Sequence, residues 1–192
     1  METYKDLPIL FFENETQWAE WLEQHHPEPT GVWLKFAKKA SGITSLNYAG
    51  ALDEALCYGW IDGQTKSIDE TYYLQKFTPR RAKSIWSKRN VGKIAELTEQ
   101  GRMKPSGQAA VEAAKQDGRW DQAYDGPSKI TVPPDFQAML DSNPKAKEFY
   151  ESLNKTKSYA ILWSIQTAKK PETRQARMEK FLAMLLEGKK VH

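Results

Sequence analysis

Apolar positions recur at helical spacing near the start of the chain and then change to strand-like alternation. Asn14, followed three residues later by Gln17, is typical of a capping box at the start of a helix. The apolar side chains from Trp18 to Leu22 then share one helical face. After a proline-rich turn, residues 32–36 alternate between the two sides of an extended chain, which predicts a strand.

A second helix and a second strand are predicted further along. The helix runs from Asn47 to Gly59, with its apolar residues on one face and a glycine at its end. Trp60–Gly63 is predicted to lead into a turn, and the aromatic run Tyr72–Phe77 to form a strand. Together with residues 32–36, these segments predict a small antiparallel sheet.

Helical periodicity dominates after Ser84. The exception is Gly126–Pro134, which holds three prolines and a glycine and is the best candidate for a linker. We therefore predict an α+β fold in two parts. Residues 1–127 form a domain with helices around the small antiparallel sheet, and residues 132–192 form an all-helical C-terminal module.

Composition indicates a globular protein and excludes several classes. Of the 192 residues, 40% are hydrophobic and 28% are charged, which is not the balance of a disordered chain. The single cysteine, Cys57, permits no internal disulfide and suits a reducing compartment. No apolar run approaches the length of a membrane span, and the start does not resemble a signal peptide, so the cytoplasm is expected. A net charge of +3 is too small to argue for nucleic acid.

The segment from Thr71 to Ala95 is basic and contains neither Asp nor Glu. Its cations are Lys76, Arg80, Arg81, Lys83, Lys88, Arg89 and Lys93, interleaved with Tyr72, Tyr73, Phe77 and Trp86. Cations bind phosphates or carboxylates, aromatic faces stack on planar ligands, and a helix starting near Ser84 would add free backbone N–H groups. The segment therefore indicates an anionic or planar ligand, unless it is a solvated face packed against acids. Those acids would be Asp53, Glu54, Asp62, Asp69 and Glu70.

An enzyme in this chain would depend on Asp62 and Cys57. Asp62 lies among large apolar residues, where the pKa of a carboxyl group rises and the group can act as a general base. An Asp before Gly63 equally fits an ordinary turn, which we favour. No histidine is near Cys57 in the sequence, so a buried structural thiol is the favoured interpretation. The catalytic residues, if there are any, stay unknown.

Neither a metal nor a cofactor is expected. The three histidines, His25, His26 and His192, do not have the spacing of metal ligands, and no calcium-binding loop is present. The chain also lacks the motifs of nucleotide-binding, dinucleotide-binding and serine hydrolase folds.

Several ordered strings resemble the bacterial YdeI/OmpD-associated family, also called bacteriocin-protection proteins. They are GVWLKFAKKASG (Gly31–Gly42), EALCYGWIDG (Glu54–Gly63), FTPRRAKSIWSKRN (Phe77–Asn90), GRMKPSGQAAV (Gly101–Val111), DGRWDQAYD (Asp117–Asp125), VPPDF (Val132–Phe136) and AKKPETRQAR (Ala168–Arg177). The resemblance implies a stress-response role in tolerance of bacteriocins or other envelope-active antimicrobials, and an association with a porin. It supplies no catalytic residue.

The sequence therefore favours a binding protein over an enzyme. Its candidate ligand surface consists of Trp60, Asp62, Arg80, Arg81 and Trp86. The expected partners are an anionic small molecule or peptide, or a protein of the cell envelope, while nucleic acid is disfavoured. Two alternatives stay open, namely a small enzyme with a pocket around Asp62 and Cys57, and a weak nucleic-acid binder.

Overall fold

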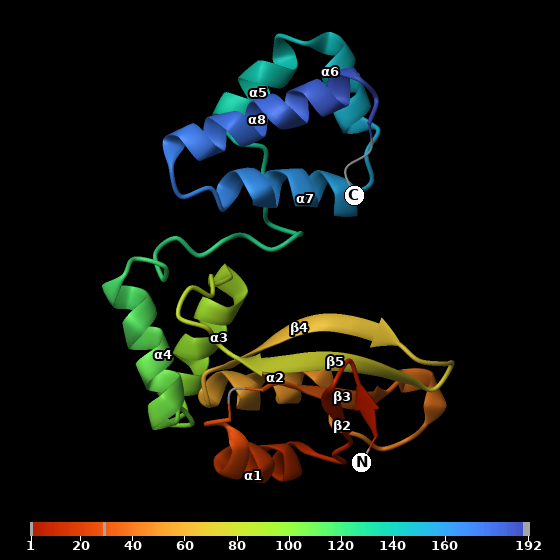
Figure 1. Cartoon of the computed structure of the whole chain (residues 1–192), viewed down its shortest axis with the longest axis vertical. Coiled ribbons are helices and arrows are strands. Elements are labelled where there is room, and N and C mark those ends of the chain that lie inside the picture. The colour runs from red at the N-terminus through yellow and green to blue at the C-terminus, as the bar shows by residue number, and fades with distance from the viewer. Residues whose placement is uncertain (1, 29, 190–192) are drawn as a thin grey trace. The chain divides into compact units, whose positions relative to one another are not determined.

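The computed structural model describes residues 2–28 and 30–189, so His192 lies outside the described residues (Figure 1). Its internal contacts divide the chain into two units. Unit 1 runs as far as Ile85 and resumes from Asn90 to Asp121, while unit 2 consists of Trp86–Arg89 and the chain from Gln122 onward. This division lies a few residues before the linker predicted from the prolines.

Unit 1 contains a five-stranded sheet in the order β1-β2-β3-β5-β4. The strands are β1 (Thr3–Tyr4), β2 (Leu7–Leu10), β3 (Val32–Ala37), β4 (Trp60–Ser67) and β5 (Tyr72–Pro79). β5 pairs antiparallel with both β3 and β4, which confirms the predicted antiparallel core of the sheet. β2 pairs parallel with β3, so the whole sheet is mixed. The short apolar run of β2 was not predicted as a strand.

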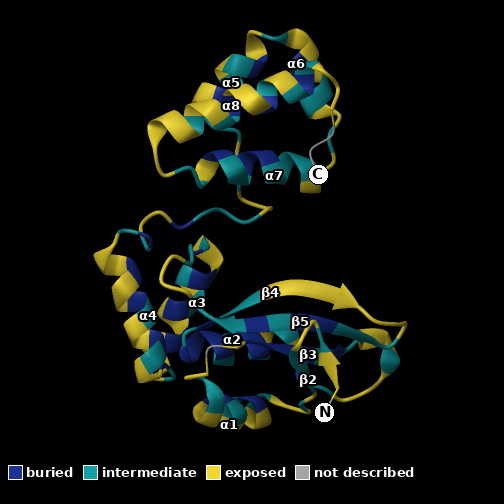
Figure 2. Cartoon of the chain, viewed as in Figure 1, coloured by how far each residue is buried: buried dark blue, intermediate teal, exposed yellow. Residues whose placement is uncertain are grey.

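Two helices, α1 (Glu15–His25) and α2 (Tyr48–Cys57), cover one face of the sheet (Figure 1). Both begin with an asparagine cap, of which the one at Asn14 was predicted. The Asn14 Oδ1 accepts the Gln17 N–H at 3.0 Å, and the Asn47 Oδ1 accepts the Gly50 N–H at 2.9 Å. The core between the helices and the sheet is aromatic: the rings of Trp18 and Phe77 pack with centroids 5.9 Å apart. Figure 2 shows this core as the dark blue part of α2 and β5.

Two local predictions in the middle of the chain are wrong. Trp60–Gly63 is not the approach to a turn but the start of β4, which pairs with β5 across a bulge between Asp62 and Thr65. A bulge admits the extra residue without ending the strand. The helix expected near Ser84 begins only at Lys88. Unit 1 also contains α4 (Pro105–Gln116) and, apart from its first two residues, α3 (Lys88–Glu99), and a short 3-10 helix occupies Lys39–Ser41.

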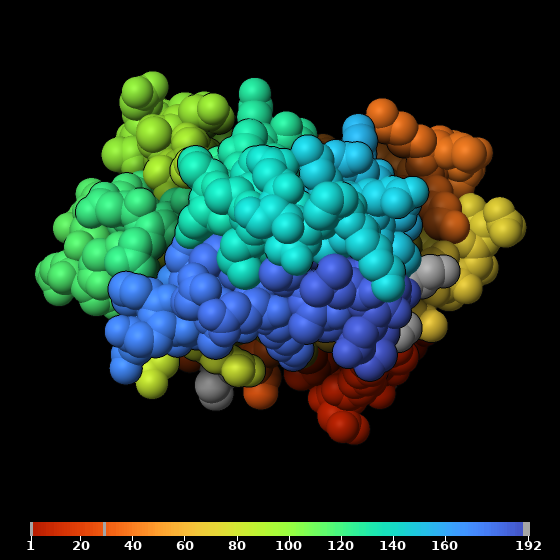
Figure 3. Space-filling model, turned by 90° about the horizontal axis from the view of Figure 1, so that it is seen from above, coloured from red at the N-terminus to blue at the C-terminus, as the bar shows by residue number. Residues whose placement is uncertain are grey.

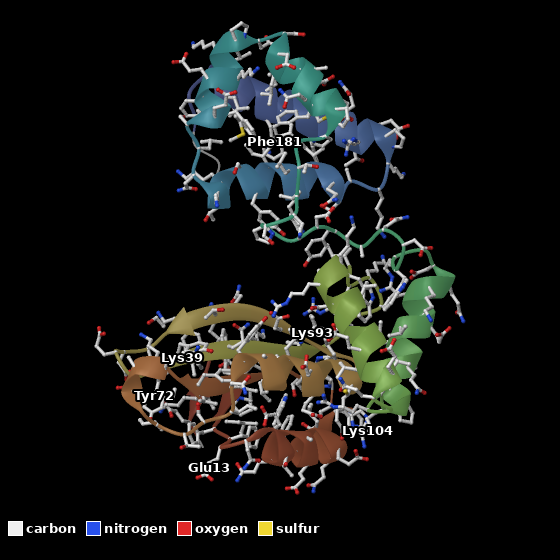
Figure 4. The ribbon with its side chains drawn as sticks, turned by 180° about the vertical axis from the view of Figure 1, so that it is seen from behind. Glu13, Lys39, Tyr72, Lys93, Lys104 and Phe181 are labelled. Atoms are coloured by element: carbon white, nitrogen blue, oxygen red, sulfur yellow. The ribbon has the colours of Figure 1, made fainter. Side chains whose placement is uncertain are left out.

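Unit 2 is helical, as predicted for the C-terminal part. Its helices are α5 (Pro134–Asp141), α6 (Pro144–Glu151), α7 (Lys155–Gln166) and α8 (Pro171–Leu186). They enclose a core of their own that includes Phe136, Ile161 and Phe181, the last of which is labelled in Figure 4. Figure 3 shows α8 (deep blue) packed alongside α6 (cyan). None of the helices formed by residues 2–28 and 30–189 combines the length and the apolar character that crossing a membrane requires.

Candidate functional site

Trp60 lies in the interior of unit 1. Its side chain is 0% exposed, and its indole N–H donates to the His26 carbonyl oxygen at 3.1 Å. Its ring meets those of Trp18 and Trp21 nearly at right angles, with centroids 6.2 and 5.9 Å away. The aromatic surface expected to hold a ligand is therefore used by the core.

Asp62 lies on the side of β4 that faces α2. Its Oδ2 accepts a hydrogen bond of 2.7 Å from the Tyr48 hydroxyl, at the first residue of α2. Asp62 is opposite Phe77 in the register of β4 and β5, and Phe77 packs on Trp18 of α1. Because directly opposite residues point to the same side of a sheet, this places Asp62 on the helix-covered face. Its carboxylate joins β4 to α2.

The remaining candidates differ in exposure. Trp86 is 1% exposed and belongs to unit 2. Arg80 is half-buried, and its Nη1 donates to the Ile85 carbonyl oxygen at 3.3 Å. Arg81 is exposed in a turn that closes through its backbone N–H and the Ser84 Oγ, 3.0 Å apart. Of the five candidates, Arg81 offers the most accessible cation.

Some cations of the basic segment are neutralised by acids, as the solvated-face alternative required. The Lys93 Nζ lies 2.5 Å from the Asp53 Oδ1 and ties α3 to α2 (Lys93 is labelled in Figure 4). Within unit 2, the Lys88 Nζ lies 2.9 Å from the Asp125 Oδ2, and this hydrogen bond holds the pKa of Asp125 below its ordinary value. By contrast, Lys76, Arg81 and Lys83 form no ion pair with any acid of the described chain.

A basic sheet face, which the sequence did not reveal, lies opposite the helices. We use this name for the surface of β3, β5 and β4 that presents Lys35, Lys66 and Lys76. Lys35 and Lys66 both pair with Leu74, from opposite sides, while Lys76 pairs with Trp33. These residues alternate with the buried, helix-facing positions and therefore point away from the helices. The sequence shows the alternation but not the pairing that brings the lysines together.

Acids are scarce on the basic sheet face. The only acid within strands β3, β4 and β5 is Asp62, which points to the helices. In the turn between β4 and β5, the Asp69 Oδ1 accepts the N–H groups of Thr71 and Tyr72 at 2.7 and 2.8 Å. These backbone hydrogen bonds, that of Tyr72 first, lower the pKa of Asp69. None of the three lysines forms an ion pair within the described residues.

A shallow hollow of about 190 Å³ lies at one end of the basic sheet face. It is lined by Glu2, Ile9, Phe11, Lys35 and Tyr72. The Lys35 Nζ lies 4.4 Å from the centre of the Tyr72 ring, within the range of a cation–π interaction. Phe11 meets the same ring edge-on, with centroids 6.5 Å apart, and is 43% exposed. The hollow thus combines aromatic walls with a cation.

A larger groove of about 680 Å³ runs between α3 and α4. Its lining is mostly apolar and consists of Val91, Ile94, Ala95, Thr98, Glu99, Met103, Gln108, Val111, Glu112, Lys115 and Trp120. The Glu112 carboxylate is already paired with Lys115 at 3.0 Å. The groove therefore offers shape and apolar surface, but little that would select one ligand.

Cys57 is enclosed at the end of α2 and is 1% exposed. Burial raises the pKa of its thiol to about 11, and the nearby Glu54 adds to this effect. A thiol becomes a nucleophile only as the thiolate, so Cys57 is poorly suited to catalysis near neutral pH. Within residues 2–28 and 30–189, no group of three or more His, Cys, Asp or Glu side chains is placed to hold a metal ion.

We expect Cys57 to resist alkylation in the folded protein. The raised pKa leaves about a hundredfold less thiolate at neutral pH than an ordinary cysteine has, and burial blocks the reagent as well. The measurement is the rate of iodoacetamide incorporation at pH 7.5, by mass spectrometry, in native protein and in guanidinium. Comparable rates in the two states would show that the thiol is accessible.

The comparisons with known proteins match the two parts of the chain to different families. A family model described as a domain of unknown function (DUF8412) matches residues 10–110, more than half of the chain. A second model, described as Bacteriocin-protection, YdeI or OmpD-Associated, matches residues 129–188 and confirms the resemblance for the helical C-terminal part. No curated protein and no solved structure matches the chain. The chain therefore belongs to the DUF8412 family and carries a bacteriocin-protection, YdeI or OmpD-associated segment at residues 129–188.

Proposed function

We propose that this chain is a binding protein rather than an enzyme, and that it holds an anionic ligand on the basic sheet face. The observation that carries the proposal is the convergence of Lys35, Lys66 and Lys76, from three adjacent strands, on one side of the sheet. The description of the family at residues 129–188 favours a role in tolerance of bacteriocins. A cytoplasmic location is part of the same proposal.

The spacing of the lysines favours a ligand with several charges. Neighbouring strands are about 4.8 Å apart, so the Cα atoms of Lys35 and Lys66 are separated by about 10 Å across β5. Lys76 lies two residues beyond Leu74, or about 7 Å along the strand. A single small anion cannot contact all three ammonium groups unless the flexible lysine side chains bend toward one another. A chain of phosphates or carboxylates can, and each contact adds to the attraction.

Arg80 and Arg81 remain part of the proposed ligand surface, because they follow β5 directly in the chain. The Arg80 N–H donates to the Gly59 carbonyl oxygen at 2.9 Å, which fixes the direction of the chain as it leaves the sheet. Arg81 and Lys83 are exposed just beyond this point and extend the positive charge. The rival enzyme around Asp62 and Cys57 loses support, since the thiol is buried and the carboxylate is bonded to Tyr48.

The test compares two triple variants with the same change in charge. In the first, Lys35, Lys66 and Lys76 are replaced by Gln; in the control, the exposed Lys155, Lys169 and Lys180 of unit 2 are replaced by Gln. We expect the first variant to bind inorganic polyphosphate at least about tenfold more weakly than the parent in low salt, and the control to change less than about twofold. Isothermal titration calorimetry measures both.

Two results would contradict the proposal. If both triple variants lost affinity equally, the attraction would come from net charge and not from the basic sheet face. If the parent protein bound no polyanion even in low salt, the basic sheet face would have no role of this kind.

A further inference from the structure

Two exposed apolar residues, Phe11 and Ile68, contact Tyr72. Within the described chain, three large hydrophobic residues are clearly exposed, namely Phe11, Ile43 and Ile68. Phe11 contacts the Tyr72 ring, and the Ile68 N–H donates to the Tyr72 carbonyl oxygen at 3.2 Å. Large apolar side chains left in water beside a row of cations suggest a ligand with an apolar part as well as charges.

The hollow beside Tyr72 fits a flat ring. Its volume of about 190 Å³ compares with the cavity of about 150 Å³ that accommodates benzene in an engineered core. The Phe11 and Tyr72 rings are nearly perpendicular, at 86°, so a ring stacked on one of them meets the edge of the other. Lys35 covers Tyr72 in the free protein, and this cation–π contact is worth only about 0.5–1 kcal/mol at an exposed site. An incoming ring can displace the Lys35 ammonium group from the Tyr72 ring. The ammonium group can then contact an anionic group of the ligand.

Glu2 decides which part of the ligand enters the hollow. Glu2 lines the same hollow as Lys35, and its negative charge repels a phosphate group there. The carboxylate can instead accept a hydrogen bond from the amino group of a base. The phosphates are thereby directed along β5 to Lys66 and Lys76, where no acid lies within the described strands on that face.

From this arrangement we infer that the ligand of the basic sheet face is a single-stranded nucleic acid, with one base seated between Phe11 and Tyr72. The inference rests on the proposed function and specifies its ligand. Proteins that bind single strands combine aromatic rings, on which bases stack, with a track of cations for the backbone. A duplex keeps its bases stacked inside and cannot place one in the hollow. The small net charge of the chain does not conflict with this, because the contact is made by one face of one unit.

The deciding experiment compares an intact labelled 12-nucleotide single strand with a strand of the same length whose nucleotides are abasic. Both carry the same phosphates, so only the intact strand can fill the hollow. By fluorescence anisotropy, we expect the parent protein to bind the intact strand about tenfold more tightly. Replacing Phe11 or Tyr72 with Ala removes this preference and leaves binding of the abasic strand unchanged. Ile43→Ala, at a residue that is also 43% exposed, is the matched control and keeps the preference.

Two further variants separate the contribution of the aromatic ring from that of the lysine charges. Phe11→Leu retains apolar packing without a ring, so it loses the preference even if Tyr72→Ala disturbs the strand. The triple Gln variant of Lys35, Lys66 and Lys76 binds both strands more weakly. Its slope of log affinity against log salt falls by about 0.7 for each lysine that contacts a phosphate.

Three outcomes overturn the inference. Equal binding of intact and abasic strands, together with lysine-dependent binding of polyphosphate, would leave the proposed function standing and remove the nucleic acid. Preference for vesicles containing phosphatidylglycerol over the intact strand would assign the face to a membrane surface. Absence of binding to every anion would remove both proposals.

Discussion

Replacing Trp60 with Ala is expected to lower the free energy of unfolding by about 3–5 kcal/mol. The side chain is fully buried, and its ring packs on Trp18 and Trp21. The substitution opens a large cavity between the sheet and α1, and it leaves the His26 carbonyl oxygen without the indole N–H. A loss of this size is a large share of the stability of an ordinary domain.

Guanidinium denaturation followed by far-UV circular dichroism measures the change, because it does not depend on the number of tryptophans. Trp60→Phe is the matched control and keeps most of the apolar volume, so we expect a smaller loss. The same variants separate a core role from a ligand role. A Trp60→Ala protein as stable as the parent, but with weakened binding of polyphosphate, would return this residue to the ligand surface.

The elements that could be predicted from the sequence are those whose signals are local. The cap at Asn14 depends on a side chain and on a backbone N–H three residues away, so the sequence contains all of the information. The antiparallel sheet of residues 32–36 and 72–77 was predicted from strand-like alternation in the first segment and from the aromatic, β-prone residues of the second. β2 was not predicted because its partner in the sheet is β3, and the whole of α1 separates these two strands in the sequence.

Asp62 shows why the same reasoning failed for β4. An Asp before a Gly is a common turn signal, and no local feature reveals that β5 will pair with this segment on both sides of a bulge. Once β4 and β5 have paired, the Asp62 carboxylate accepts a hydrogen bond from the hydroxyl of Tyr48, which is fourteen residues away in the chain. Ladder hydrogen bonds formed at long range outweighed the local preference.

The candidate site was predictable only in part. The excess of cations in residues 71–95 is visible in the sequence, and Lys76 and Arg81 belong to it. Lys35 and Lys66 lie outside that segment and reach the same face through strand pairing alone. Trp60 was a candidate because it is an aromatic residue close to an acid. Whether its ring contacts a ligand or the core depends on burial, and burial is a property of the whole fold. The net charge of the chain likewise does not reveal that cations are concentrated on the basic sheet face.

Gly107→Ala is expected to lower the stability of the protein, because α4 packs closely on α2 at this residue. A Cβ atom added at Gly107, in the first turn of α4, would lie 2.1 Å from the Cys57 carbonyl oxygen and 2.7 Å from its carbon. Both are backbone atoms of α2 and cannot swing away as a side chain can. The Lys104 N–H donates to the same oxygen at 3.1 Å, so moving the helices apart also breaks this hydrogen bond. We expect a loss of about 1–3 kcal/mol or more, as for overpacked cores.

Gly92→Ala is the matched control, because Gly92 lies within α3 and a Cβ atom there would meet nothing within 4 Å. Alanine favours a helix over glycine by about 1 kcal/mol, so this variant should be more stable than the parent. Both substitutions make the same chemical change in a helix, and both restrict the unfolded chain alike. The opposite signs expected in guanidinium denaturation therefore isolate the close approach of α4 to α2. If Gly107→Ala raised stability as Gly92→Ala does, the two helices would have room between them and the close packing of α4 on Cys57 would be refuted.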